Sequence, residues 1–152
     1  MLSRIRLALL VALVAGVALL PFPSLAQGPV KVFRCPERLE GISQSLATTP
    51  EGWESGRLEV THWVANLTFY DGPVAEKASL VPDASGRDGE KVNESWKLNP
   101  KNPRDYWIEC SYLGTSLTLM KNIGRGYRQC TAQYDPNVLV GGQPSFEELR
   151  CR

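Results

Sequence analysis

Few side chains in this chain of 152 residues could catalyse a reaction. His62 is the one histidine, and strand alternation groups it with Leu58, Val60 and Val64. That setting favours a hydrogen-bonded histidine of the core or of a strand edge over a catalytic base. No G-x-S-x-G elbow occurs, and no second histidine is present to serve a triad. We therefore predict that the protein is not an enzyme.

Other patterns that could hold a substrate or a cofactor have structural explanations. Glu147 and Glu148 are adjacent, so on a helix they point in different directions and are better explained by a solvated terminus than by glycosidase chemistry. Gly124-Arg125-Gly126 is too short for a phosphate loop and indicates a turn. The sequence holds no C-x-x-C spacing, so we expect neither a redox pair, nor a metal site, nor any other cofactor.

The four cysteines, Cys35, Cys110, Cys130 and Cys151, indicate two structural disulfides if the chain is exported. Three pairings are possible. Alternation places Cys110 on the apolar face of the segment 106–112 and Cys130 on that of 128–134. We therefore predict that Cys110 pairs with Cys130, which leaves Cys35 to pair with Cys151.

Residues 1–26 have the three parts of a cleavable signal peptide. Arg4 and Arg6 precede an apolar run at 7–20, and Ser24 and Ala26 precede a predicted cleavage site. The run is short for a membrane span, which takes about 20 residues, and no cysteine stands at the site to carry a lipid. We therefore predict a periplasmic or secreted protein without a stable membrane anchor.

Residues 27–152 have the length of one domain. Removing the signal leaves 15 basic and 16 acidic side chains, a formal charge of −1, which argues against a nucleic-acid partner. Short apolar segments separated by glycine and proline predict a mainly β protein. We expect a small antiparallel sheet or sandwich-like domain with two disulfides and a short C-terminal helical turn, because Ser145 and Glu148 have capping-box spacing.

Several segments carry more specific predictions. Residues 57–64 form a strand, and the apolar parity changes after Val64, which requires a bulge near Ala65 and Asn66. Residues 106–112 pair with 117–120 across a turn at Gly114, and 128–134 complete a meander. Residues 83–90 form a polar, mobile loop. Residues 37–46 are ambiguous between helix and strand, and extended structure is favoured.

Binding at the surface remains as a role. Tryptophan, tyrosine and arginine often anchor interfaces, and Trp107 lies on the strand face opposite Cys110. Taken singly, a tryptophan is more often part of the core, and lysine and arginine more often form a solvated rim. The candidate binding patch consists of Trp107, Lys121, Arg125, Tyr127 and Arg128.

The sequence also resembles a known family. The resemblance lies in Phe69-Tyr70-Asp71-Gly72-Pro73, in Leu80-Val81-Pro82-Asp83, in Trp96 and in residues 106–112 ahead of Cys130. It extends to Cys35-Pro36 and Gly52-Trp53. These motifs are similar to those of small, uncharacterised exported proteins of Gram-negative bacteria, a family named after an enterobacterial secretion-island locus. The resemblance implies a periplasmic setting and no known activity.

Three hypotheses on function follow. The favoured one is a non-enzymatic protein that binds an envelope protein, as an inhibitor or neutraliser of an envelope enzyme or toxin. The alternative is a module that binds a glycan, peptidoglycan or small ligand through tryptophans. The third, an enzyme of unrecognised type, is disfavoured by the single histidine and the missing motifs.

Overall fold

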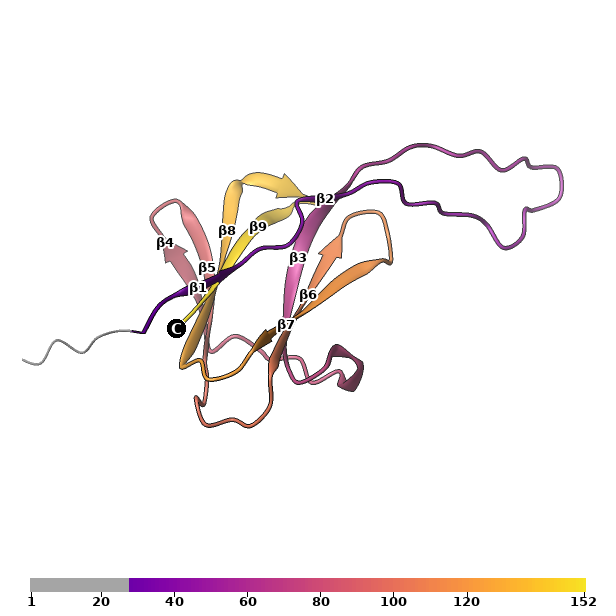
Figure 1. The fold of residues 1–152 in the computed structure, drawn as a ribbon. Coiled ribbons are helices and arrows are strands. Elements are labelled where there is room, and N and C mark those ends of the chain that lie inside the picture. The colour runs from indigo at the N-terminus through magenta and orange to yellow at the C-terminus, as the bar shows by residue number, and fades with distance from the viewer. Residues whose placement is uncertain (1–27) are drawn as a thin grey trace, which may run out of the picture.

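The computed structural model describes residues 28–152, and the predicted signal peptide lies outside this range. The fold is mainly β, as predicted, and consists of two antiparallel sheets (Figure 1). The five-stranded sheet has the order β1-β9-β8-β5-β4, with β1 Lys31–Phe33, β9 Gln143–Cys151, β8 Gln129–Val140, β5 Lys91–Lys97 and β4 Ala84–Asp88. The four-stranded sheet has the order β2-β3-β6-β7, with β2 Arg38–Leu39, β3 His62–Asp71, β6 Tyr106–Tyr112 and β7 Thr118–Gly124. A short 3₁₀ helix, η1, spans Val74–Glu76.

The core lies between the two sheets. Along β6 every second residue is buried from Tyr106 to Tyr112, as the alternation predicts. Phe69 of β3 joins the sheets, because its ring lies 5.2 Å from that of Trp96 on β5 and 5.5 Å from that of Tyr106 on β6. The Trp96 indole donates a hydrogen bond to the Leu80 carbonyl at 3.2 Å, so its polar edge is satisfied inside the protein.

The predicted bulge in β3 is confirmed. The register of β3 against β6 shifts between Val64 and Asn66. The extra residue moves the apolar positions from even to odd numbers, so Val64, Leu67 and Phe69 are all buried. The predicted pairing of residues 106–112 with 117–120 is also confirmed, as β6 with β7.

The predicted C-terminal helical turn is wrong. Ser145 and Glu148 lie in strand β9, which pairs with β1 on one side and β8 on the other. A register shift near Tyr134 places Phe146 and Leu149 on the core side although their numbers differ in parity. Tertiary packing overrides the local capping-box pattern here, because the apolar side chains of β9 pack into the core when the segment is a strand between β1 and β8.

Two other segments differ from expectation. The predicted mobile loop at residues 83–90 forms the edge strand β4, which pairs with β5 across a turn at Gly89. The predicted meander through residues 128–134 is wrong, since β8 pairs with β5 and β9 in the other sheet and not with β7. Alternation fixes which face of a strand is buried, but it does not fix the sheet to which the strand belongs.

The disulfides join Cys35 to Cys110 and Cys130 to Cys151, so both predicted pairings are wrong. Cys130 and Cys151 stand directly opposite each other on β8 and β9, with Cα atoms 4.1 Å apart. Cys35 lies where the chain crosses from β1 in one sheet to β2 in the other, and it bonds to Cys110 of β6. Cys110 and Cys130 both face the core, as expected, but from opposite sheets.

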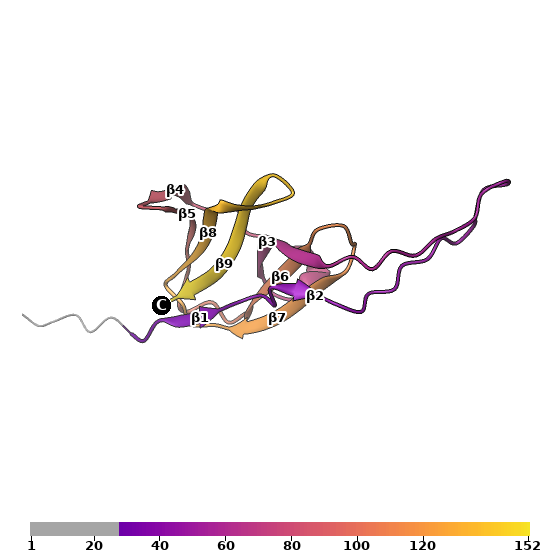
Figure 2. The same ribbon diagram turned by 90° about the horizontal axis from the view of Figure 1, so that it is seen from above.

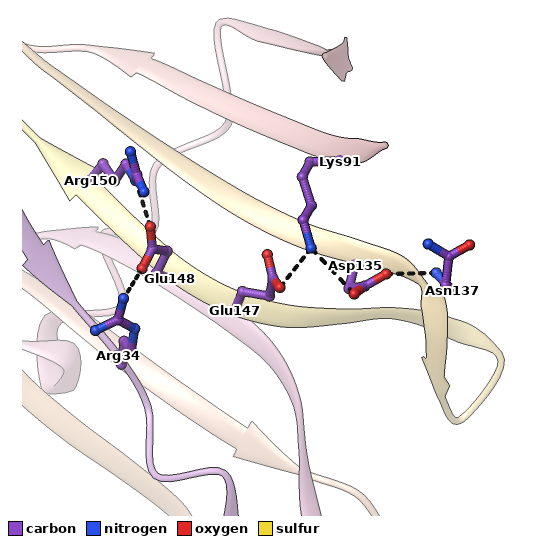
Figure 3. A network of polar contacts seen from close by, with 7 residues as sticks. All are labelled: Arg34, Lys91, Asp135, Asn137, Glu147, Glu148 and Arg150. Carbon is purple, nitrogen blue, oxygen red and sulfur yellow. Dashed lines mark hydrogen bonds and ion pairs between the residues drawn. The ribbon is translucent and has the colours of Figure 1, made fainter. Parts of the chain in front are cut away.

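Charged side chains form two groups of contacts along β9 (Figure 3). The Glu148 carboxylate is 8% exposed and is held between the guanidinium groups of Arg34 and Arg150, which are largely exposed. Arg34 directly follows β1, so the pairing helps to fasten this short edge strand to β9. Burying an isolated carboxylate costs free energy, and the two charged hydrogen-bond donors offset that cost for Glu148.

A second charged group lies farther along the same hairpin. The Lys91 ammonium of β5 lies 2.7 Å from a Glu147 oxygen and 3.2 Å from an Asp135 oxygen (Figure 3). The backbone N–H of Asn137 donates to the Asp135 carboxylate at 2.8 Å. These contacts tie β5 to the far part of the β8–β9 hairpin.

The contacts in these two charged clusters shift the pKa values of their members. Burial raises the pKa of Glu148, but Arg150 and Arg34 lower it by more, so the pKa of Glu148 lies below its ordinary value. The Asn137 N–H and Lys91 hold the pKa of Asp135 below its ordinary value. The hydrogen bond to Glu147 raises the pKa of Lys91.

We predict that replacing Cys35 and Cys110 with alanine lowers the free energy of unfolding by about 4 kcal/mol, because the bond closes a long loop in the unfolded chain. The Cys130–Cys151 bond, with a separation of 21 residues against 75, contributes about 3 kcal/mol by the same reasoning. Urea unfolding measures both values. Peptide mapping without reduction that finds Cys110 linked to Cys130 would contradict this disulfide pattern.

We predict that the melting temperature is nearly constant between about pH 6 and pH 8 and falls below about pH 4.5. A carboxyl whose pKa is lower in the folded state stabilises the protein above its unfolded pKa, about 4.3 for glutamate, and loses that contribution as pH falls through the folded value. Glu148→Gln should show a smaller fall between pH 6 and pH 3 than the wild type, whereas Glu90→Gln, at an exposed turn, should match the wild type. Equal falls in all three proteins would contradict the role of Glu148.

Candidate functional site

One end of the sandwich carries an open, largely apolar groove of about 330 Å³. Its walls come from the start of β3, from the residue after β6 and from the tip of the β8–β9 hairpin. Leu113, Val138 and Leu139 are about half exposed, at 47%, 52% and 62%. Concave apolar surface of this kind is typical of binding sites. The groove is lined by Glu37, Trp63, Val64, Leu113, Val138, Leu139, Val140, Gly141 and Ser145.

Buried contacts hold the groove in shape. His62 is buried at the start of β3, and its Nδ1 lies 2.8 Å from the Leu113 carbonyl oxygen, so Nδ1 carries the hydrogen and donates. The prediction that His62 is a hydrogen-bonded structural residue is confirmed. Gly141 turns the hairpin with φ at +61°, and a Cβ there would lie 3.1 Å from the Leu113 side chain, so this position requires glycine.

Trp63 forms the exposed wall of the groove. In the pairing of β2 with β3, Arg38 stands opposite Trp63. The Arg38 guanidinium lies 5.9 Å from the centre of the Trp63 ring. The Val64 N–H donates to the Glu37 carbonyl at 2.9 Å, which fixes the backbone of both segments. Trp63 is still 40% exposed, so an aromatic surface with an acidic and a basic neighbour is available to a partner.

A long arm, residues 40–61, projects from this same end (Figures 1 and 2). It joins β2 to β3, and the two views agree that it extends away from both sheets. Every residue from 43 to 61 is exposed. The arm turns near its tip, where the Trp53 N–H donates to the Pro50 carbonyl at 3.1 Å. At its base, the Gln44 side chain donates to the Gly114 carbonyl at 3.1 Å.

The arm corrects the predicted strand at residues 57–64. Strand β3 begins at His62, and Leu58 and Val60 are 87% and 57% exposed instead of buried. The reason is that β2 has two residues, which pair with His62 and Trp63. Among residues 28–152 no strand pairs with residues 57–61, so their alternation has no sheet to face. The preference for extended structure at 37–46 agrees with β2 and the first part of the arm.

One residue of the predicted binding patch does not lie on the surface. Tyr127 is buried, packs edge-on against Phe33 and donates its hydroxyl to the Ile123 carbonyl at 2.5 Å, so its predicted place on the surface is wrong. Trp107 is half-buried on β6, and Arg125 is exposed and donates to the Pro103 carbonyl. Lys121 and Arg128 are exposed on β7 and just before β8. Trp107 and Arg125 lie at the end of β6 and β7 that is remote from the groove.

The amino-acid composition carries a signal for the arm but none for the groove. Residues 41–56 are rich in glycine, serine, threonine and proline and have no apolar periodicity, which is typical of a long loop. Long loops without secondary structure are uncommon in small domains and are often functional. Val138 and Leu139 give no comparable signal, because apolar residues in a hairpin look like strand residues that are buried.

Two further properties concern residues 28–152. In this range no helix has the length and apolar character that crossing a membrane requires. The same range contains no group of three or more histidine, cysteine, aspartate or glutamate side chains arranged to hold a metal ion.

Comparisons with known proteins give a relative and a family. An uncharacterised 16.3 kDa protein in the trpG 5′ region of Azospirillum brasilense is 29% identical over 159 residues, which covers 99% of this chain and 98% of the relative. No solved structure matches this chain.

The family match covers residues 57–152, which include residues 57–61 at the end of the arm and the strands β3 to β9. It supports the expected resemblance to a secretion-associated family of Gram-negative proteins. Because it covers more than half of the sequence, the chain belongs to the family of type VI secretion system Tli immunity proteins.

Proposed function

We propose that this protein protects the cell that makes it by binding and neutralising a secreted toxin in the periplasm. Membership of an immunity protein family is the observation that carries this proposal. An immunity protein acts on a toxin by binding it, which fits a chain whose single histidine is used to hold the fold. The family favours a delivered toxin over a resident envelope enzyme as the target.

The cysteines support the periplasm as the compartment. Both disulfides are buried or partly buried in the fold, and disulfides persist in oxidising compartments such as the periplasm. The sequence of residues 1–26 has the features of a cleavable signal peptide. An immunity protein in the periplasm would meet a toxin that acts there before the toxin reaches its substrate.

A competition assay between bacterial strains tests the proposal and also identifies the toxin. We predict that a strain from which this gene is deleted is killed by its parent during contact, and that the full-length gene restores survival. A parent without an active type VI secretion system should not kill. The toxin is then the secreted protein whose removal from the parent abolishes killing. Full survival of the deletion strain beside an active parent would contradict the proposed function.

The compartment is tested in the same assay. We predict that a copy lacking residues 2–26 accumulates in the cytoplasm and fails to protect, whereas the full-length chain is recovered from the periplasmic fraction with both disulfides formed. Fractionation and labelling of free thiols measure these two properties. Protection by the copy without residues 2–26 would place the encounter with the toxin in the cytoplasm and contradict this part of the proposal.

A further inference from the structure

The arm, residues 40–61, exposes apolar side chains that a free domain has no reason to expose. Trp53, at the turn, is 75% exposed, and Leu46 and Leu58 are 65% and 87% exposed. Large apolar side chains gathered on one projecting segment are typical of an element that becomes buried in a partner. The lack of internal secondary structure leaves the arm free to follow the surface of that partner.

The arm is acidic. Residues 40–61 hold four glutamates and one arginine, a formal charge of −3, although residues 27–152 together carry −1. Glu40 pairs with Arg38, but in the part of the chain that the structure describes, Glu51, Glu54 and Glu59 take part in no ion pair. Unpaired charges around apolar anchors select a partner surface of opposite charge.

The base of the arm is fixed although its tip is not. The Cys35–Cys110 bond and the β2–β3 pairing hold the chain where it leaves the sandwich, and the hydrogen bond from His62 to the Leu113 carbonyl holds it where it returns. The returning half leads through Leu58 and Val60 to Trp63, which lines the groove, so the arm and the groove lie next to each other along the chain. A partner that grips the arm therefore also reaches the groove.

The family match begins at Arg57, inside the arm. The sandwich strands β3 to β9 thus belong to the part that the match covers, whereas residues 40–56 of the arm, with its tip, lie outside it. An element outside the matched part of the fold fits a role in choosing one partner among many.

We propose that residues 40–61 are the element that recognises the toxin. The arm inserts Trp53 and its apolar neighbours into an apolar cleft of the toxin whose rim is cationic, and the groove at Trp63 and Leu113 receives the adjoining surface. This inference rests on the proposed neutralisation of a toxin. The occupant is the toxin and not a second copy of this chain, because an acidic arm repels an identical arm.

The test uses the full-length gene in the competition assay. Replacing residues 43–58 by a short Gly-Ser linker should leave the melting temperature and the periplasmic level unchanged, because Gln44 makes the one hydrogen bond that joins this segment to the sandwich among the described residues. Survival should nevertheless fall about tenfold or more, the size of effect expected from losing interface anchors. Undiminished survival with the shortened arm would overturn the role of the arm and leave the proposed function standing.

Point variants test the apolar anchors and the acidic charge of the arm separately. Trp53→Ala and Leu58→Ala should reduce survival, whereas Val81→Ala, an equally exposed apolar residue outside the arm, should not. The triple reversal of Glu51, Glu54 and Glu59 to lysine should abolish protection, and the paired change Asp88→Asn with Glu90→Gln should have no effect. Unchanged protection by the triple reversal would exclude a cationic rim on the toxin.

The oligomeric state tests whether the arm binds a second copy of this chain instead of the toxin. The wild-type protein and the shortened-arm variant should both sediment as monomers in analytical ultracentrifugation. A wild-type dimer that becomes monomeric without the arm would show that the arm binds a second copy of the chain, and would overturn the proposal. If deletion of the whole gene causes no killing, the proposed function and the inference both fail.

Discussion

The fold depends on one crossing of the chain between the two sheets. Residues 34–37 leave β1 in the five-stranded sheet and enter β2 in the four-stranded sheet, and the Cys35–Cys110 bond fixes this crossing to the centre of β6. This crossing positions the two elements that follow it in the chain. It holds β2 against β3, and it sets the point at which the arm leaves the sandwich. The disulfide therefore stabilises the domain and also presents its most exposed segment.

Much of the fold was predictable because strands repeat every two residues. The inward face of β6, the bulge after Val64 and the β6–β7 pairing all follow from the spacing of apolar residues. The structural role of His62 was predicted from its alternation with apolar residues, although of these only Val64 is buried. The sequence and the comparisons point to a binding role by different routes.

The errors have a common physical origin, because local pattern does not determine long-range pairing. Cys110 and Cys130 share an inward orientation but belong to different sheets, so the pairing inferred from orientation failed. Ser145 and Glu148 have the spacing of a helix start, yet strands on both sides hold them in β9. Leu58 and Val60 alternate like strand residues, but the two-residue β2 leaves them without a neighbour. Tyr127 was predicted to lie on the surface, because its burial depends on contact with Phe33, which is far away in the sequence. A local pattern does not reveal that contact.

Hydrogen–deuterium exchange of the disulfide-bonded protein, alone and bound to the toxin found by genetic competition, tests the central claim most directly. The structure predicts that binding slows exchange in the arm, residues 40–61, and at the groove, in residues 113–114 and 138–141. It predicts little change at residues 121–128, which lie at the other end of the sandwich. Slowed exchange confined to residues 121–128, with an arm that exchanges as fast as in the free protein, would contradict this account.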